Sequence, residues 1–196
     1  MSSREVELVR RTIERYVALT ADDRSAILPC WKRYRFQRGA YISRAGSVED
    51  HFYIVEEGVQ RLYIEHDGAE ICLGFSYGNS WTGDFDSFVR RSPGRFQVQA
   101  LSDSVLLGIT YADLNRLYET VPVMERFGRR ILEEQVVGRA TREIEQIALS
   151  AEERLDRFLQ RSPHLLQLVS QKDIASYLRM TPETFSRLRA RMVGRS

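Results

Sequence analysis

The chain has 196 residues, of which 43% are hydrophobic and 29% charged, with a net charge of +2, a composition that suits one large or two small soluble domains. The longest apolar runs, such as "VLLGI" at 105–109, are far shorter than the roughly 20 residues that span a membrane, and the charged N-terminus lacks the apolar segment of a signal peptide. Two cysteines are too few for a disulfide framework or a cysteine-ligated cluster, so we expect a cytoplasmic protein with free thiols and no membrane partner.

The first elements are predicted to be two helices. Residues 4–19 carry apolar side chains near helical spacing, and Thr20 with Asp23 forms a capping box that opens a second helix, which ends near Pro29. From about 33 to 111 the sequence pattern changes to short runs of alternating apolar and polar residues between glycine-containing turns. Within this region, "HDGAE" is typical of a hairpin turn. These patterns predict a closed or rolled antiparallel β domain, an architecture that commonly encloses a small-ligand cavity.

After Tyr111 the pattern is helical to the end. A short helix at 111–122 precedes a long helix from Pro122 to about Leu149, in which two offset apolar seams follow one another: Met124, Phe127 and Ile131, then Val137, Ala140, Ile144 and Ile147. Two seams indicate that the helix packs on its own domain and on a second element. We prefer a parallel helix of a second copy, with burial inside one domain as the alternative. A capping box at Ser150 opens the next helix, which ends near Pro163.

The last 27 residues predict a pair of short, capped helices. Ser170 and Thr181 stand at the two caps, and Pro182 takes the first position of the second helix, where a missing N–H is tolerated. On a helical wheel the second helix has one apolar face, made of Phe185, Leu188 and Met192. The opposite face carries Glu183, Ser186, Arg187 and Ala190, with Arg189 and Arg191 beside it.

This arrangement is the one that a helix-turn-helix needs, because one stripe of the second helix packs on the first and the other enters the major groove of DNA. Arginine suits guanine and glutamate accepts from cytosine, while flanking arginines suit phosphates. The last 18 residues hold five arginines against one acid, which fits a phosphate-facing surface or a solvated face. Arg179 stands at the turn, where a left-handed backbone would cost arginine about 1 kcal/mol relative to glycine.

With these elements in place, the chain resembles the Crp/Fnr family of bacterial transcription regulators over nearly its whole length. "YIVEEGVQRLYIEHDGAEICLGFSYGNSWTGDF" is similar to the family's β-roll, and "QKDIASYLRMTPETFSRLR" is similar to its DNA-reading unit. The resemblance implies base-reading roles for Glu183 and Arg187, double-stranded DNA with a palindromic operator as partner, and RNA polymerase as a further candidate partner. The full set of expected DNA-binding residues is Lys172, Thr181, Glu183, Ser186, Arg187, Arg189 and Arg191.

The ligand cassette departs from the family pattern. Members that bind cyclic AMP carry Gly-Glu-Leu and, about ten residues later, Arg-Ser-Ala, whose glutamate accepts from the ribose and whose arginine pairs with the phosphate. Here the first element reads Gly83-Asp84-Phe85, and the arginine position falls on Gly94, leaving Arg95 one residue out of register. We expect that cyclic AMP does not bind at micromolar levels. An unidentified effector is expected instead, or none, near Trp81, Gly83, Asp84, Phe85, Arg95 and Phe96. A bulge at Pro93-Gly94 that returns Arg95 to the pocket is the alternative.

The predicted fold class is α+β: a double-stranded β-helix (jelly-roll) sensor domain over 1–120, a dimerisation helix over 121–148 with homodimer contacts at 122–147, and a helix-turn-helix domain without a wing over 149–196. A rival interpretation keeps the ligand sensor but gives the C-terminal helices a protein-binding role. An enzyme is not expected, because the three histidines show no metal-ligand spacing and no GxSxG or GKS/T loop is present.

Overall fold

The computed structural model describes the backbone of residues 1–193 and the side chains through Arg191, so the side chain of Met192, predicted on the apolar face of the last helix, lies outside the described part. The chain forms two compact units. Unit 1 combines Met1–Leu62 with Phe75–Gln135, and unit 2 combines Tyr63–Gly74 with Val136–Ser196. The division falls inside the long helix, whereas the boundaries expected at 120 and 148 follow the two ends of that helix.

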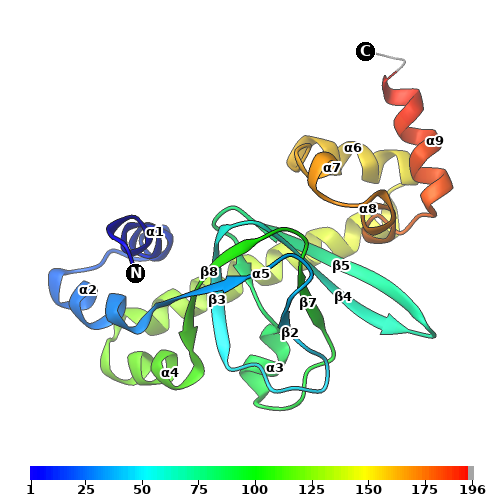
Figure 1. Ribbon diagram of the computed structural model, residues 1–196. Coiled ribbons are helices and arrows are strands. Elements are labelled where there is room, and N and C mark those ends of the chain that lie inside the picture. Colours follow the sequence, from blue (N-terminus) through cyan, green and yellow to red (C-terminus); the bar gives the residue numbers. More distant parts are fainter. Residues whose placement is uncertain (194–196) are drawn as a thin grey trace. The chain divides into compact units, whose positions relative to one another are not determined.

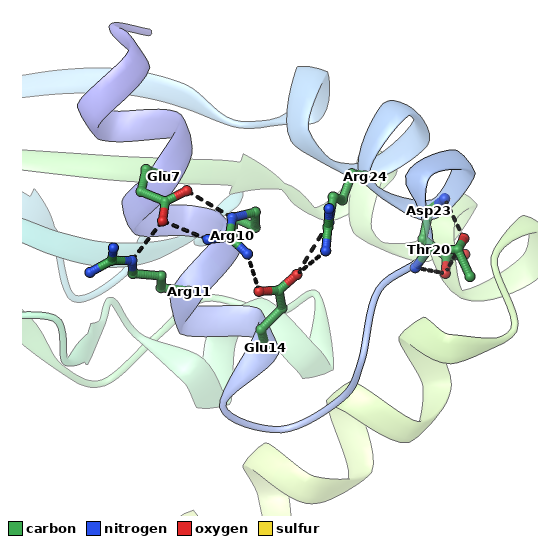
Figure 2. A network of polar contacts seen from close by, with 7 residues as sticks. All are labelled: Glu7, Arg10, Arg11, Glu14, Thr20, Asp23 and Arg24. Atoms are coloured by element: carbon green, nitrogen blue, oxygen red, sulfur yellow. Dashed lines mark hydrogen bonds and ion pairs between the residues drawn. The ribbon is translucent and has the colours of Figure 1, made fainter.

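Unit 1 begins with two capped helices, α1 (Ser3–Glu14) and α2 (Ala21–Ile27), and a short 3-10 turn, η1 (Leu28–Cys30). The capping box predicted at Thr20 is confirmed. The expectation of a helix to residue 19 is wrong: α1 ends at Glu14, because the chain then turns to bury Tyr16, Val17 and Leu19 in the core. Figure 2 shows the polar contacts on this side, where the Glu14 carboxylate accepts from both Arg10 of α1 and Arg24 of α2. These contacts join the two helices.

Two antiparallel four-stranded sheets form the β domain (Figure 1). The first sheet has the order β1-β8-β3-β6 and the second has the order β2-β7-β4-β5, so most neighbours in space are not neighbours in sequence. This interleaved order is that of a rolled sandwich, which confirms the predicted jelly-roll class. The strands are β1 (Lys32–Phe36), β2 (Tyr41–Ser43), β3 (His51–Glu57), β4 (Val59–His66), β5 (Ala69–Tyr77), β6 (Trp81–Thr82), β7 (Gln97–Ala100) and β8 (Ser104–Thr110).

The hairpin predicted at "HDGAE" is present between β4 and β5. Its two turn residues, Asp67 and Gly68, both have positive φ angles, of 51° and 74°. Two consecutive left-handed residues match a type I′ turn, whose twist suits the strands on either side. The Asp-Gly pair in the sequence therefore determines both the position of the turn and its type.

The core of unit 1 lies where the first sheet meets α1, α4 (Tyr111–Thr120) and the start of α5 (Val123–Ala148). The first predicted seam of α5, Met124, Phe127 and Ile131, is buried there. Trp81 lies among aromatic rings, stacked on Phe52 at 4.6 Å and edge-on to Phe127 at 5.9 Å. The short helix α3 (Phe85–Arg90) also contributes Phe88 to this core.

Unit 2 contains α6 (Ala151–Arg161), α7 (Leu165–Leu168), α8 (Gln171–Tyr177) and α9 (Pro182–Val193). The capping box at Ser150 is confirmed, and Ser170 caps α8 by accepting from the backbone N–H of Asp173 at 3.0 Å. The apolar side chains from these helices gather in one small core. Its buried members are Leu155, Phe158, Leu165, Val169, Ile174, Ala175, Leu178, Phe185 and Leu188. Among the described residues, none of the helices is long and apolar enough to cross a membrane.

Candidate nucleic-acid interface and sensor cassette

Helices α8 and α9 form the predicted helix-turn-helix. Thr181 caps α9, because its hydroxyl accepts from the backbone N–H of Thr184 at 3.2 Å, and Pro182 occupies the first helical position. Phe185 and Leu188 are buried, as the wheel predicted. Between the helices Arg179 has a φ of +55°, so the turn does require the left-handed backbone that the sequence suggested, and arginine provides it at a conformational cost.

The polar face of α9 is open to solvent. Glu183, Ser186 and Arg187 are exposed, as are Thr181, Lys172 of α8 and Arg191, whereas Arg189 is half-buried. The backbone N–H of Glu183 and then the Thr181 hydroxyl lower the pKa of the Glu183 carboxyl, which is therefore ionised and acceptor-only at neutral pH. All seven expected DNA-binding residues thus lie on α8, α9 and the turn between them, and six of them are exposed.

Arg154 of α6 supports the turn, and sequence reasoning missed it. Its Nε donates to the carbonyl of Leu178 at 2.8 Å, Nη2 donates to that of Arg179 at 3.3 Å, and Nη1 donates to that of Leu149 at 2.5 Å. One guanidinium therefore satisfies carbonyls at the end of α8 and just after α5. A positive residue in the first turn of a helix, against the helix dipole, was the available signal.

Asp84, one of the expected pocket residues, lies at the start of α3. It caps this helix, because Oδ1 accepts from the Ser87 N–H at 3.1 Å. Its own N–H donates to the Ser43 hydroxyl at 3.2 Å, and the residue is only 2% exposed. Its second oxygen, Oδ2, is buried without a hydrogen-bond partner. The short aspartate side chain is thereby turned back onto α3.

Gly94, at the arginine position of the cassette, approaches this carboxylate closely. A Cβ at Gly94 would lie 1.9 Å from Oδ2 of Asp84. The backbone around it is fixed, since the Gly94 N–H donates to the carbonyl of Ser47 and its carbonyl accepts from Gly46. No side chain fits at this position without a rearrangement.

Arg95 points away from the cassette. Its side chain is 76% exposed and its Nη2 lies 3.6 Å from the Asp86 carboxylate, in a contact that solvent screens. Its Cζ lies 5.7 Å from the centre of the Phe96 ring. The described contacts of Arg95 are therefore with two half-buried residues nearby, Asp86 and Phe96.

A cavity of about 210 Å³ opens beside Asp84. Its lining residues are Tyr41, Ile42, Ser43, Arg44, Ser47, Val48, Glu49 and Asp84. Asp84 is the one member of the six expected pocket residues among them; Trp81 and Phe85 pack instead against the aromatic core. Sequence reasoning missed Glu49, whose Oε1 accepts from the N–H groups of Asp50 and His51, at 3.0 Å each, and whose Oε2 accepts from Ser43.

The cavity beside Asp84 is lined by more acidic than basic side chains. Two buried carboxylates, Glu49 and Asp84, line the cavity, and the arginine position is Gly94. Arg44 is the one basic residue in the lining, and its guanidinium lies over the Tyr41 ring at 4.0 Å. Within the described chain no group of three or more histidine, cysteine or acidic side chains is placed to hold a metal ion.

Comparison with known proteins finds similarity within the β domain and over most of the chain. Residues 33–121 match the model of the cyclic nucleotide-binding domain. The fumarate and nitrate reduction regulatory protein of Yersinia pestis is 29% identical over 167 residues, which cover 79% of this chain and 66% of that protein. The chain is therefore similar to regulators of the Crp/Fnr type over most of its length. The protein of the same name from Escherichia coli K12 matches to the same extent.

Solved structures of Crp/Fnr type share the fold. FixK2 from Bradyrhizobium japonicum superposes with a TM-score of 0.74 at 18% identity, covering 84% of this chain and 85% of that one. The catabolite activator protein of Thermus thermophilus gives a TM-score of 0.57 at 20% identity, covering 94% and 87%. The curated relatives named above are regulators, not enzymes, which agrees with the expectation that this chain is not an enzyme.

Proposed function

We propose that the protein is a dimeric, sequence-specific DNA-binding transcription regulator of the Crp/Fnr type. The observation that carries this proposal is the division of α9 into two faces. Phe185 and Leu188 are buried against the rest of the helical unit, while Glu183, Ser186 and Arg187 are exposed together. Such a helix can enter the major groove, where Arg187 suits guanine, Glu183 accepts from cytosine, and Lys172, Arg189 and Arg191 suit phosphates.

The second half of α5 is the proposed dimer contact. Val137, Ile144 and Ile147 of the second predicted seam are 65%, 63% and 79% exposed, although each is a large apolar side chain. A parallel α5 from a second copy would cover this stripe and would relate the two α9 helices by a two-fold axis. Two-fold symmetry suits a palindromic operator with half-sites about 34 Å apart.

The sensor pocket is proposed to respond to something other than cyclic AMP, or to hold no ligand. This proposal is supported by the carboxylates of Glu49 and Asp84, by the absence of a side chain at Gly94, and by the exposure of Arg95. A phosphate placed beside two buried carboxylates would be repelled rather than bound. RNA polymerase stays a prediction from the family resemblance.

The test combines selection of binding sites from random duplex DNA with light scattering of the free protein. We expect enrichment of a palindromic sequence, a steep fall in affinity with salt, and a dimer at micromolar concentration. Ile144→Glu should yield a monomer that keeps its fold, because like charges across a two-fold interface repel. Recovery of no preferred sequence by the folded dimer would contradict the proposal and would favour a protein-binding role for α8 and α9.

A further inference from the structure

The tip of the β4–β5 hairpin belongs to the same compact unit as the helix-turn-helix. Residues Tyr63–Gly74 group with Val136–Ser196, although β5 itself continues to Tyr77 within unit 1. The direct link is a hydrogen bond from the backbone N–H of Cys72 to the Ser176 hydroxyl of α8, at 2.9 Å. Cys72 is 2% exposed, so this hydrogen bond joins α8 to a buried residue of the hairpin.

Arg142 of α5 reinforces the same contact. Its guanidinium lies over the ring of Tyr177, the neighbour of Ser176, at 4.1 Å. The same group approaches the hairpin, since a Cβ at Gly74 would lie 3.5 Å from its Nη1. Nη2 is buried without a hydrogen-bond partner, and burial lowers the pKa of the group. A cation kept in this position despite its desolvation is held by the packing of α5, α8 and the hairpin.

The hairpin contacts the side of α8 that does not face α9. Ile174 and Ala175 of α8 are buried in the helical core, and Ser176 falls on the opposite side of the helical wheel. With this contact in place, Glu183 and Arg187 of α9 remain exposed. The hairpin therefore contacts α8 on the side away from α9, and the polar face of α9 remains exposed.

We infer that Ser176 is a positioning residue for DNA binding, and that its hydrogen bond to Cys72 fixes α8 and α9 in an orientation that suits the operator. The inference rests on the proposed function. Its physical basis is linkage: if the hairpin contact is more populated in the DNA-bound protein than in the free protein, removal of the contact weakens DNA binding, and DNA binding in turn stabilises the contact.

The experiment compares Ser176→Ala with Ser176→Thr, which keeps a hydroxyl, in the full-length protein. Two quantities are measured: the affinity for the selected operator, and the hydrogen exchange of the Cys72 amide with and without DNA. We expect Ser176→Ala to weaken specific binding about two- to tenfold and to speed Cys72 exchange by a similar factor, since one net hydrogen bond is lost. Ser176→Thr should restore both values, and DNA should slow Cys72 exchange in the wild type.

Ser102→Ala is the matched control. The Ser102 hydroxyl accepts from the backbone N–H of Val59 at 3.1 Å, which is the same kind of bond in unit 1. This variant should speed exchange at Val59 and leave operator affinity unchanged.

Two results would overturn the inference while leaving the proposed function intact. One is unchanged operator affinity in Ser176→Ala despite faster Cys72 exchange, which would make the contact purely structural. The other is tighter binding by Ser176→Ala, which would make the contact inhibitory. If the wild type itself selects no operator, the proposed function fails, and the inference fails with it.

Discussion

The cassette around Asp84 and the outer face of α9 use polar side chains in opposite ways. In the cassette, Asp84 and Glu49 are buried, and their oxygens accept mainly from backbone N–H groups and a serine of the same chain. On α9, Glu183 and Arg187 are exposed, and the structure offers them to an external partner. The comparison teaches that polar side chains of one chain can be used for internal hydrogen bonds in one region and remain exposed to solvent in another.

Side-chain length suits Asp84 to its position as the cap of α3. Asp84 is one methylene shorter than glutamate, which suits a cap that accepts from the third N–H of α3. In this position Oδ2 of Asp84 lies so close to Gly94 that it would clash with the Cβ atom of an arginine there. Aspartate at position 84 and glycine at position 94 are therefore sterically compatible with each other, whereas aspartate at 84 and arginine at 94 are not.

The largest expected effect is on the DNA affinity of the exposed face of α9. Arg187→Ala should weaken specific DNA binding by about 1–3 kcal/mol per half-site, roughly fivefold to 150-fold, and relax the preference at the contacted base pair. Arg191→Ala, at a flanking position, should weaken specific and random DNA about equally and reduce the salt slope. Fluorescence anisotropy with operator and scrambled duplexes measures both. Equal losses on the two duplexes for Arg187→Ala would remove the base-reading role assigned to this residue.

Substitutions in the cassette around Asp84 are expected to change the stability of the protein. Gly94→Ala should destabilise the protein by about 1–3 kcal/mol, because the new methyl group meets the Asp84 carboxylate at 1.9 Å. Combining it with Asp84→Ala should cost less than the sum of the two single changes, since the second change removes the clashing group. Thermal unfolding of the four proteins gives the coupling. Additive losses would show that Gly94 is required for another reason.

A smaller effect is expected at the turn of the helix-turn-helix. Arg179→Gly should stabilise unit 2 by about 0.5–1 kcal/mol, because φ is +55° and the arginine side chain is exposed. Arg91 offers a control with a φ of 52°, but its guanidinium donates to the Glu49 carbonyl at 2.6 Å and to Asp50 at 2.8 Å. Arg91→Gly should therefore destabilise unit 1. A rise in the melting temperature for both variants would mean that backbone conformation alone determines the change in stability.

The sequence determined the fold because its signals were local. The Asp67-Gly68 turn, the caps at Thr20, Ser150 and Ser170, and the two seams of α5 can each be recognised within a few residues. The helix-turn-helix could be located for the same reason.

What the sequence could not give were contacts between distant segments. The place of Glu49 beside Asp84, the support of the turn by Arg154, and the bond between Cys72 and Ser176 join residues that are 24 to 104 positions apart or that no motif connects. The course of the chain after Glu14 was also missed, because Val17 continues the helical spacing but is buried outside the helix.

The most direct test of the account is the affinity of the protein for its selected operator, measured by anisotropy with and without micromolar cyclic AMP. The account predicts the same dissociation constant in both conditions, because the cassette offers carboxylates where the phosphate would need a cation. A clear gain in operator affinity with cyclic AMP that Arg95→Ala abolishes would contradict it, and would show that Arg95 returns to the cassette when the nucleotide binds.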